Sequence, residues 1–244
     1  HVEKVFQKAE ATSACLTPGW LDLFGTIPDP GYEEAETLET GLKAALAGGF
    51  SQGGLHSHSF QAFASKSSLD YLRRHSGLYG PEVLLTAAVT HGNEGEALTE
   101  MIDLHRHGAV AYSDAYRSLW HPDVLLKALQ YSQHVDLPLF QHARDKHLGS
   151  LGVMHEGEVS TYLGQPGIPS LSEYSVVRRD LDILRYAGGR LHLTQVSTAE
   201  AVASIAAAKK EGLQVTADVA IDHLLFTDED MEPFDADYKL EPPL

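Results

Sequence analysis

The chain of 244 residues has 18 Lys and Arg against 34 Asp and Glu, which gives a formal charge of −16 with histidine neutral. Its 43% hydrophobic and 21% charged residues are typical of a globular protein. Nucleic acids and anionic membranes bind basic surfaces, so we expect neither as a partner. No apolar run approaches the roughly 18–20 residues of a membrane span, and the single cysteine, Cys15, excludes a disulfide framework. We therefore expect a cytoplasmic protein.

Short apolar segments bounded by turn residues predict buried strands. They cover residues 20–23, 50–55, 83–88, 110–112, 138–141, 190–194 and 214–218. Each except the last is followed by a stretch with helical spacing of apolar residues, and the first such stretch ends at Gly48 and Gly49. Later helices are predicted from the capping boxes Asn93/Glu96, Ser170/Glu173 and Ser197/Glu200, and from Pro122 in the first turn of a helix that runs to about His134.

This strand–helix repetition predicts an α/β protein with parallel strands, either a doubly wound sheet or a (β/α)8 TIM-type barrel. No glycine-rich nucleotide-binding loop follows the first strand, so the barrel is favoured, with its eighth βα unit missing from this chain. An unclosed barrel leaves strand edges unpaired, and we therefore expect the natural protein to continue beyond Leu244. The glycine-rich stretch 143–169 is predicted to be a long loop at an active site or interface.

Several motifs in a fixed order suggest a relationship to a known family. They include residues 18–23, 29–31, 47–50, 108–114, 152–157, 196–199, 215–219 and 238–244, the last ending in Pro242-Pro243-Leu244. In this set the chain resembles dihydroorotase, the cyclic amidohydrolase of pyrimidine biosynthesis. The resemblance implies an amidohydrolase barrel over residues 18–244, with about seven βα units, preceded by a remnant of an N-terminal flanking segment at 1–17.

The resemblance also implies a site at the barrel mouth, where one or two zinc ions generate the hydroxide that attacks a ring amide. The family's first-strand His-x-His falls on Phe24 and Thr26, and its substrate-binding arginine falls on Pro28. A bridging carboxylate and one histidine are kept as Asp114 and His142. The asparagine of the family's second-strand Met-Pro-Asn-Thr motif falls near His58, and a histidine ligand falls on Gln195. The asparagine before Pro-Pro-Leu, a substrate contact in related enzymes, falls on Glu241.

Only Asp114 and His142 thus keep side chains that the resemblance assigns to the metal, whereas a catalytic zinc needs about three protein ligands. Proline cannot replace the arginine clamp, and Glu241 would repel an anionic substrate. We therefore expect a catalytically inactive homologue without a cofactor, acting as a structural or regulatory partner. The resemblance suggests aspartate carbamoyltransferase as that partner, or self-association.

A second hypothesis keeps the enzyme active. His56 and His58 form a His-x-His at the end of the second predicted strand, one strand away from the lost motif. Together with His142 they could rebuild a displaced zinc site, and the protein would then open dihydroorotate or another cyclic amide. The sequence leaves both hypotheses open.

Overall fold

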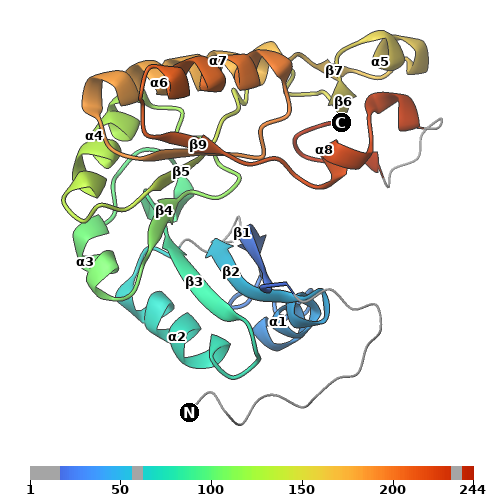
Figure 1. Cartoon of the computed structure of the whole chain (residues 1–244). Coiled ribbons are helices and arrows are strands. Elements are labelled where there is room, and N and C mark those ends of the chain that lie inside the picture. The colour runs from blue at the N-terminus through green and yellow to red at the C-terminus, as the bar shows by residue number, and fades with distance from the viewer. Residues whose placement is uncertain (1–16, 57–62, 232–237) are drawn as a thin grey trace.

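The computed structural model describes residues 17–56, 63–231 and 238–244. Seven parallel strands form one sheet in the order β1-β2-β3-β4-β5-β8-β9. They are β1 (Trp20–Thr26), β2 (Phe50–His56), β3 (Glu82–Ala87), β4 (Ala111–Ser113), β5 (Leu139–His142), β8 (Leu191–Thr194) and β9 (Val215–Ala217). Figure 1 shows this sheet curving into an open half-barrel with helices on its outside. The predicted α/β barrel architecture is confirmed.

The helices begin at the signals that small polar residues and proline supply. Thr37 and Ser65 cap their helices with reciprocal hydrogen bonds, and Pro122 occupies the first turn of its helix. The helices are α1 (Leu38–Ala47), α2 (Lys66–Ser76), α3 (Met101–Arg106), α4 (Pro122–Gln133), α5 (Glu158–Leu163), α6 (Leu171–Ala187), α7 (Ala199–Lys210) and α8 (Asp222–Leu225). None of these helices in the described part of the chain is long and apolar enough to cross a membrane.

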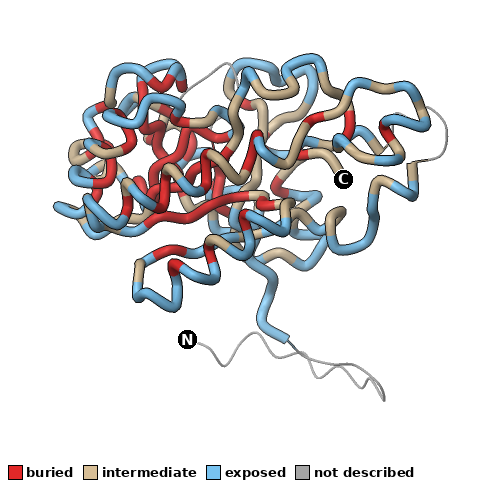
Figure 2. The backbone as a smooth tube through the Cα atoms, turned by 90° about the horizontal axis from the view of Figure 1, so that it is seen from above, coloured by how far each residue is buried: buried red, intermediate tan, exposed pale blue. Residues whose placement is uncertain are grey.

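The core lies between the sheet and its outer helices. Every residue of β4, β5 and β8 is buried, since one face packs on helices and the other faces the barrel interior. Figure 2 shows the buried residues concentrated in one part of the molecule, on the left of the view. The edge strand β1 differs, because Trp20 is 62% exposed and Leu21 45% exposed. The sheet is therefore well covered at its centre and open at β1.

Two local predictions need correction. The box Asn93/Glu96 does not start a helix: Asn93 ends a single 3-10 turn, η1 (His91–Asn93), and α3 begins only at Met101. Gly92 and Gly95 take positive φ and turn the chain there. The stretch 143–169 also has regular structure, with α5 and a separate parallel pair, β6 (Met154–His155) and β7 (Gly167–Ile168). Residues 1–16 lie outside the described residues, so the flanking segment predicted at 1–17 stays a prediction.

The predicted start of α6 at Ser170 is correct, but no capping box forms there, and α7 is capped one residue later than predicted, at Thr198. Glu173, on α6, accepts hydrogen bonds from Ser197 N (3.0 Å) and Oγ (2.8 Å), and from Thr198 N (2.9 Å) and Oγ1 (2.7 Å). Ser170 has helical backbone angles and makes no side-chain cap, and Thr198, rather than Ser197, caps α7 through Ala201 N. Glu173 therefore ties α6 to the loop between β8 and α7.

We predict that Glu173→Ala lowers the free energy of unfolding by about 2–4 kcal/mol, because it leaves several partly buried donors of Ser197 and Thr198 without an acceptor. Glu200→Ala, in the exposed first turn of α7, is the matched control and should cost about 0.5 kcal/mol. Guanidinium denaturation at pH 7 measures both. Equal losses in the two variants would show that the Glu173 contacts do not hold the fold.

Candidate functional site

Aromatic and histidine rings from four strands meet inside the half-barrel. We call the ring column the set in which each ring contacts the next: Tyr116, Phe24, His56, Phe140 and His192. Successive centroids are 5.1, 4.3, 5.2 and 4.3 Å apart, distances typical of packed aromatic pairs. Phe24, His56, Phe140 and His192 belong to β1, β2, β5 and β8. The ring column thus fills the interior next to the strand ends.

His56 lies at the middle of the ring column and is completely buried. Its Nε2 donates to Leu23 O at 2.9 Å, which leaves Nδ1 without a partner among the described residues. Burial lowers the pKa of His56 to about 4, so the ring is neutral at pH 7. The other histidine of the predicted relocated site, His58, lies outside the described residues.

At the other end, the ring column reaches a carboxylate. His192 Nε2 lies 2.9 Å from Asp218 Oδ2, and its Nδ1 lies 2.8 Å from the Thr216 hydroxyl. Asp218 also accepts from Gln195 N at 2.5 Å. Burial acts to raise the pKa of Asp218, but the hydrogen bonds from His192 and Gln195 outweigh it and hold this pKa below its ordinary value. Gln195 therefore meets Asp218 through its backbone, while its buried side-chain oxygen has no partner among the described residues.

Asp114 follows β4, and its carboxylate binds the loop that follows the neighbouring strand β3. One carboxylate oxygen accepts from Val89 N (2.8 Å) and Thr90 N (2.9 Å), and the other binds the Thr90 hydroxyl at short range. The residue is 2% exposed. Burial raises the pKa of Asp114 to about 6, against the opposing effect of the Thr90 and Val89 hydrogen bonds. Both oxygens are thus committed to the loop after β3.

His142 and Glu241 do come together. The His142 Nε2 lies 3.9 Å from a carboxylate oxygen of Glu241, and that same oxygen forms an ion pair with Arg144. Burial, and then the charge of Arg144, lower the pKa of His142 to about 4. His142 Nδ1 is buried without a partner among the described residues. Glu241 therefore neutralises Arg144 beside a neutral imidazole.

The two remaining predicted positions lie on and after β1. Thr26 is paired with His56 in the parallel register of β1 and β2. Pro28 follows the strand, and its carbonyl accepts from Tyr32 N at 2.8 Å in a turn. Phe24, two residues before Thr26, places its ring on His56 at 4.3 Å. Hydrocarbon therefore occupies one first-strand position where the resemblance expects a metal-binding imidazole.

A family zinc does not fit the side chains that the structure describes. Within residues 17–56, 63–231 and 238–244, no three His, Cys, Asp or Glu side chains converge in a way that could hold a metal ion. Asp114 is occupied by Val89 and Thr90, and Asp218 by His192 and Gln195. At the positions considered for the metal, the unpaired imidazole nitrogens are Nδ1 of His56 and of His142, and two imidazoles fall short of the about three ligands of a catalytic zinc.

Sequence reasoning missed a cleft of about 360 Å³ beside the ring column, with which it shares Tyr116. It lies between the loops that follow β4 and β5. Its lining includes Tyr116, Arg117, Trp120, Arg144, Lys146 and Glu241. The sequence places three cationic residues in the loops after two neighbouring strands of an acidic chain, and this pattern could have indicated the cleft. In a barrel such loops meet at the carboxyl ends of the strands.

We predict that Asp114 makes stability depend on pH. Because its folded pKa, about 6, lies above the ordinary 3.8, the folded state holds the proton more tightly, and its contribution falls as pH rises from about 4 to about 6. The stability of the wild type relative to Asp114→Asn should fall by about 2 kcal/mol between pH 4 and pH 7. Urea denaturation of both proteins measures this difference. A constant or rising difference would contradict the assignment.

Comparison with known proteins agrees with the barrel architecture. A family model described as "Dihydro-orotase-like" matches residues 13–201. A dihydroorotase of Pelotomaculum thermopropionicum is 37% identical over 236 residues, covering 96% of this chain and 55% of the relative. A dihydroorotase of Anaeromyxobacter sp. (strain K) is 38% identical over 238 residues, covering 96% of this chain and 55% of the relative. The chain therefore spans about half the length of these curated relatives.

Solved structures show the same fold. L-Hydantoinase (dihydropyrimidinase) from Arthrobacter aurescens aligns with a TM-score of 0.73 at 18% identity, covering 93% of this chain and 52% of that one. D-Hydantoinase from Thermus sp. aligns with a TM-score of 0.68 at 17% identity, covering 93% of this chain and 52% of the other. On the family match over most of its length, the chain belongs to the dihydroorotase-like family.

Proposed function

We propose that this chain is a non-catalytic member of its family, kept as a structural or regulatory homologue in pyrimidine biosynthesis. The observation that carries the proposal is the ring column. Phe24 takes the first-strand position that the resemblance assigns to a metal-binding histidine, and its ring packs on His56. A phenylalanine ring has no donor atom for a metal, and the partly exposed Phe24 ring contacts the buried His56 in place of a ligand.

The metal side of the site supports the proposal. The resemblance keeps Asp114 and His142 as ligands, but both Asp114 oxygens already accept hydrogen bonds from Val89 and Thr90. Binding of zinc by Asp114 would therefore remove acceptors from buried backbone N–H groups, which costs about 1–3 kcal/mol for each group left unpaired. His142 alone offers a free ring nitrogen at these two positions.

The substrate side supports it as well. Pro28 has no side chain that can bind a carboxylate, and Glu241 brings a negative charge to the position of a neutral asparagine. Glu241 pairs with Arg144 and lies 3.9 Å from His142 Nε2. An anionic substrate at this position would compete with Glu241 for Arg144. The chain therefore lacks both the arginine and the neutral asparagine that the resemblance assigns to the binding of dihydroorotate.

We predict that the full-length protein, purified without chelators, holds much less than one zinc per chain and opens dihydroorotate with a kcat far below about 1 s⁻¹ when zinc is supplied. Elemental analysis and the ring-opening assay measure the two quantities on one preparation. Stoichiometric zinc with turnover above about 1 s⁻¹ would favour the active enzyme with relocated ligands. In that event His56→Ala and His142→Ala should each lose the metal, whereas His91→Ala, an exposed control, should keep it.

The proposal includes aspartate carbamoyltransferase as the partner of this protein. We expect the protein to co-elute with aspartate carbamoyltransferase in size-exclusion chromatography of an equimolar mixture, at a volume earlier than that of either protein alone. The same run of the isolated protein reports self-association as a separate earlier peak. Elution of the two proteins at their individual volumes, at concentrations of about 10 µM and above, where a Kd in the micromolar range would be populated, would overturn the carbamoyltransferase assignment.

A further inference from the structure

A buried carboxylate on α6 orients two side chains beside the loop that follows β4. Asp180 is completely buried. Its Oδ1 accepts a hydrogen bond from Arg179 Nε at 2.8 Å, and its Oδ2 accepts from Nε2 of Gln141, on β5, at 3.0 Å. We call Asp180, Arg179 and Gln141 the clasp. Both oxygens of the clasp carboxylate therefore face N–H donors.

The two oriented side chains hold the loop by its backbone. Gln141 Oε1 accepts from Leu119 N at 3.0 Å. The guanidinium of Arg179 donates to Leu119 O at 2.7 Å and to Trp120 O at 2.8 Å. Three backbone atoms of the loop thus depend on the carboxylate of Asp180 through two intermediate side chains.

The clasp in this form needs an ionised Asp180. A protonated carboxyl carries an O–H on one oxygen, and arginine has no acceptor for it, so the O–H must face Gln141. The Gln141 amide can accept this proton only by turning over, which brings Oε1 to Asp180 and the NH2 group to Leu119 N. Two donors then face each other at Leu119. Protonation of Asp180 and the Leu119 contact therefore exclude each other.

The proton affinity of Asp180 lies in a range that a mild change of pH reaches. Burial raises the pKa of Asp180 to about 6, although the charge and hydrogen bond of Arg179 and the hydrogen bond of Gln141 act to lower it. His142, the next residue on β5, points to the other side of the strand by alternation. The folded protein therefore takes up a proton at Asp180 as the pH falls through about 6.

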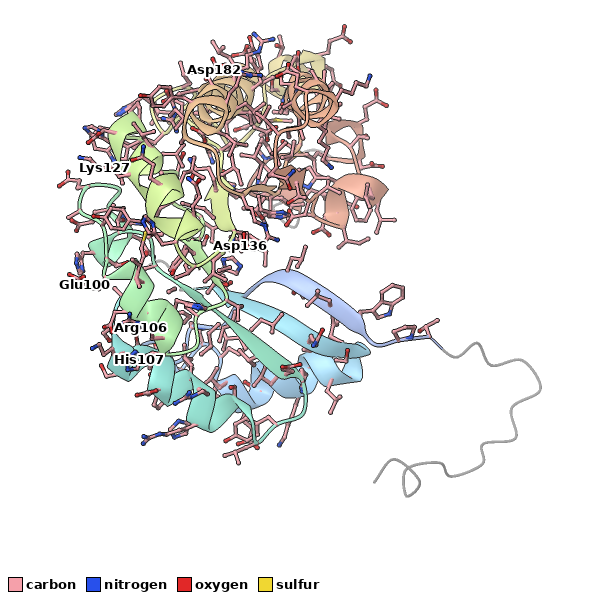
Figure 3. All side chains as sticks on the ribbon, turned by 60° about the vertical axis from the view of Figure 1, so that its left-hand side comes forward. Glu100, Arg106, His107, Lys127, Asp136 and Asp182 are labelled. Carbon is pink, nitrogen blue, oxygen red and sulfur yellow. The ribbon has the colours of Figure 1, made fainter. Side chains whose placement is uncertain are left out.

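The elements packed around Asp180 bring no other charge into its site. The residues that α4 and α7 bury are uncharged: Val124, Leu125, Ala128, Leu129, Ser132, Ala201, Ile205 and Ala208. The charged residues of α7 are exposed: Glu200, Lys209 and Lys210. Lys127 and Asp182 lie on the outer surface of α4 and α6 (Figure 3), each paired with a neighbour on its own helix. On the loop, Arg117 lowers the pKa of Asp114 instead.

From this arrangement we infer that the clasp is a proton-sensitive switch for the loop after β4, in which proton uptake by Asp180 turns the Gln141 amide and frees Leu119. The loop carries Tyr116, the end of the ring column, and Trp120, which is 43% exposed. Both line the cleft beside the ring column. Acidification therefore loosens one wall of the barrel mouth. This inference goes beyond the proposed function, since the switch needs neither zinc nor a partner.

Amide NMR of the isotope-labelled full chain tests the switch, because it observes the Leu119 N–H and the Gln141 side-chain amide directly. We expect both signals to shift with a common midpoint near pH 6. Hydrogen-exchange protection of the Leu119 N–H, corrected for the intrinsic rate at each pH, should fall by about tenfold between about pH 7.5 and about pH 5, the loss of one hydrogen bond. Circular dichroism at both pH values checks that the fold persists.

Asp180→Asn imitates the protonated form. Its carbonyl oxygen must face Arg179, so its NH2 group takes the place of the carboxyl O–H toward Gln141. At neutral pH this variant should already show the low Leu119 protection of the acidified wild type, and its Gln141 signal should show no midpoint near pH 6. Asp182→Asn, an exposed change on the same helix, is the matched control and should keep both properties of the wild type.

The amides of Val89 and Thr90 serve as an internal control. They bind Asp114, whose pKa is also raised to about 6, so their signals should titrate in Asp180→Asn as in the wild type. The inference is overturned by a wild-type Gln141 amide that shows no midpoint between about pH 5 and about pH 7.5, a result that does not depend on whether the variant folds. A folded Asp180→Asn with full Leu119 protection at neutral pH would overturn it as well. Zinc content and turnover enter none of these readouts, so the switch and the proposed function fail separately.

Discussion

Rings from four strands pack against one another inside the half-barrel and limit what else can occupy the site. Alternate residues of parallel strands point to the same face, so β1, β2, β5 and β8 each deliver side chains to one interior space. In this chain Phe24, His56, Phe140 and His192 fill it as touching rings. A packed apolar interior keeps His56 neutral through burial. The space near the strand ends is therefore taken by ring contacts.

The polar groups around the ring column are committed to the protein itself. Asp114 binds the backbone at Val89 and Thr90, and Asp218 binds His192 and Gln195. Glu241 pairs with Arg144. Buried polar groups in folded proteins are generally satisfied in this way. The carboxylates that could serve a metal or a proton transfer instead hold loops and side chains together, which is consistent with a structural role for this end of the barrel.

Much of the fold could be predicted from local sequence, because short apolar runs between turn residues specify strands such as β5 and β8. The capping boxes failed where a distant group intervened: Glu173 binds Ser197 and Thr198 rather than the start of its own helix. The candidate site was predicted only as a set of positions. Its ring contacts, and the cleft at Arg117 and Lys146, depend on strand order and curvature, which a residue pattern does not specify.

In the proposed non-catalytic role, ring packing rather than zinc coordination fills the barrel mouth. Anomalous diffraction at the zinc absorption edge, from crystals of the full-length protein grown with zinc, tests it most directly. We predict no peak within coordination distance, about 2.0–2.3 Å, of Asp114, His142 or the histidines of the ring column, with the Phe24 ring still in contact with His56. A peak at that place held by three or more side chains would contradict it.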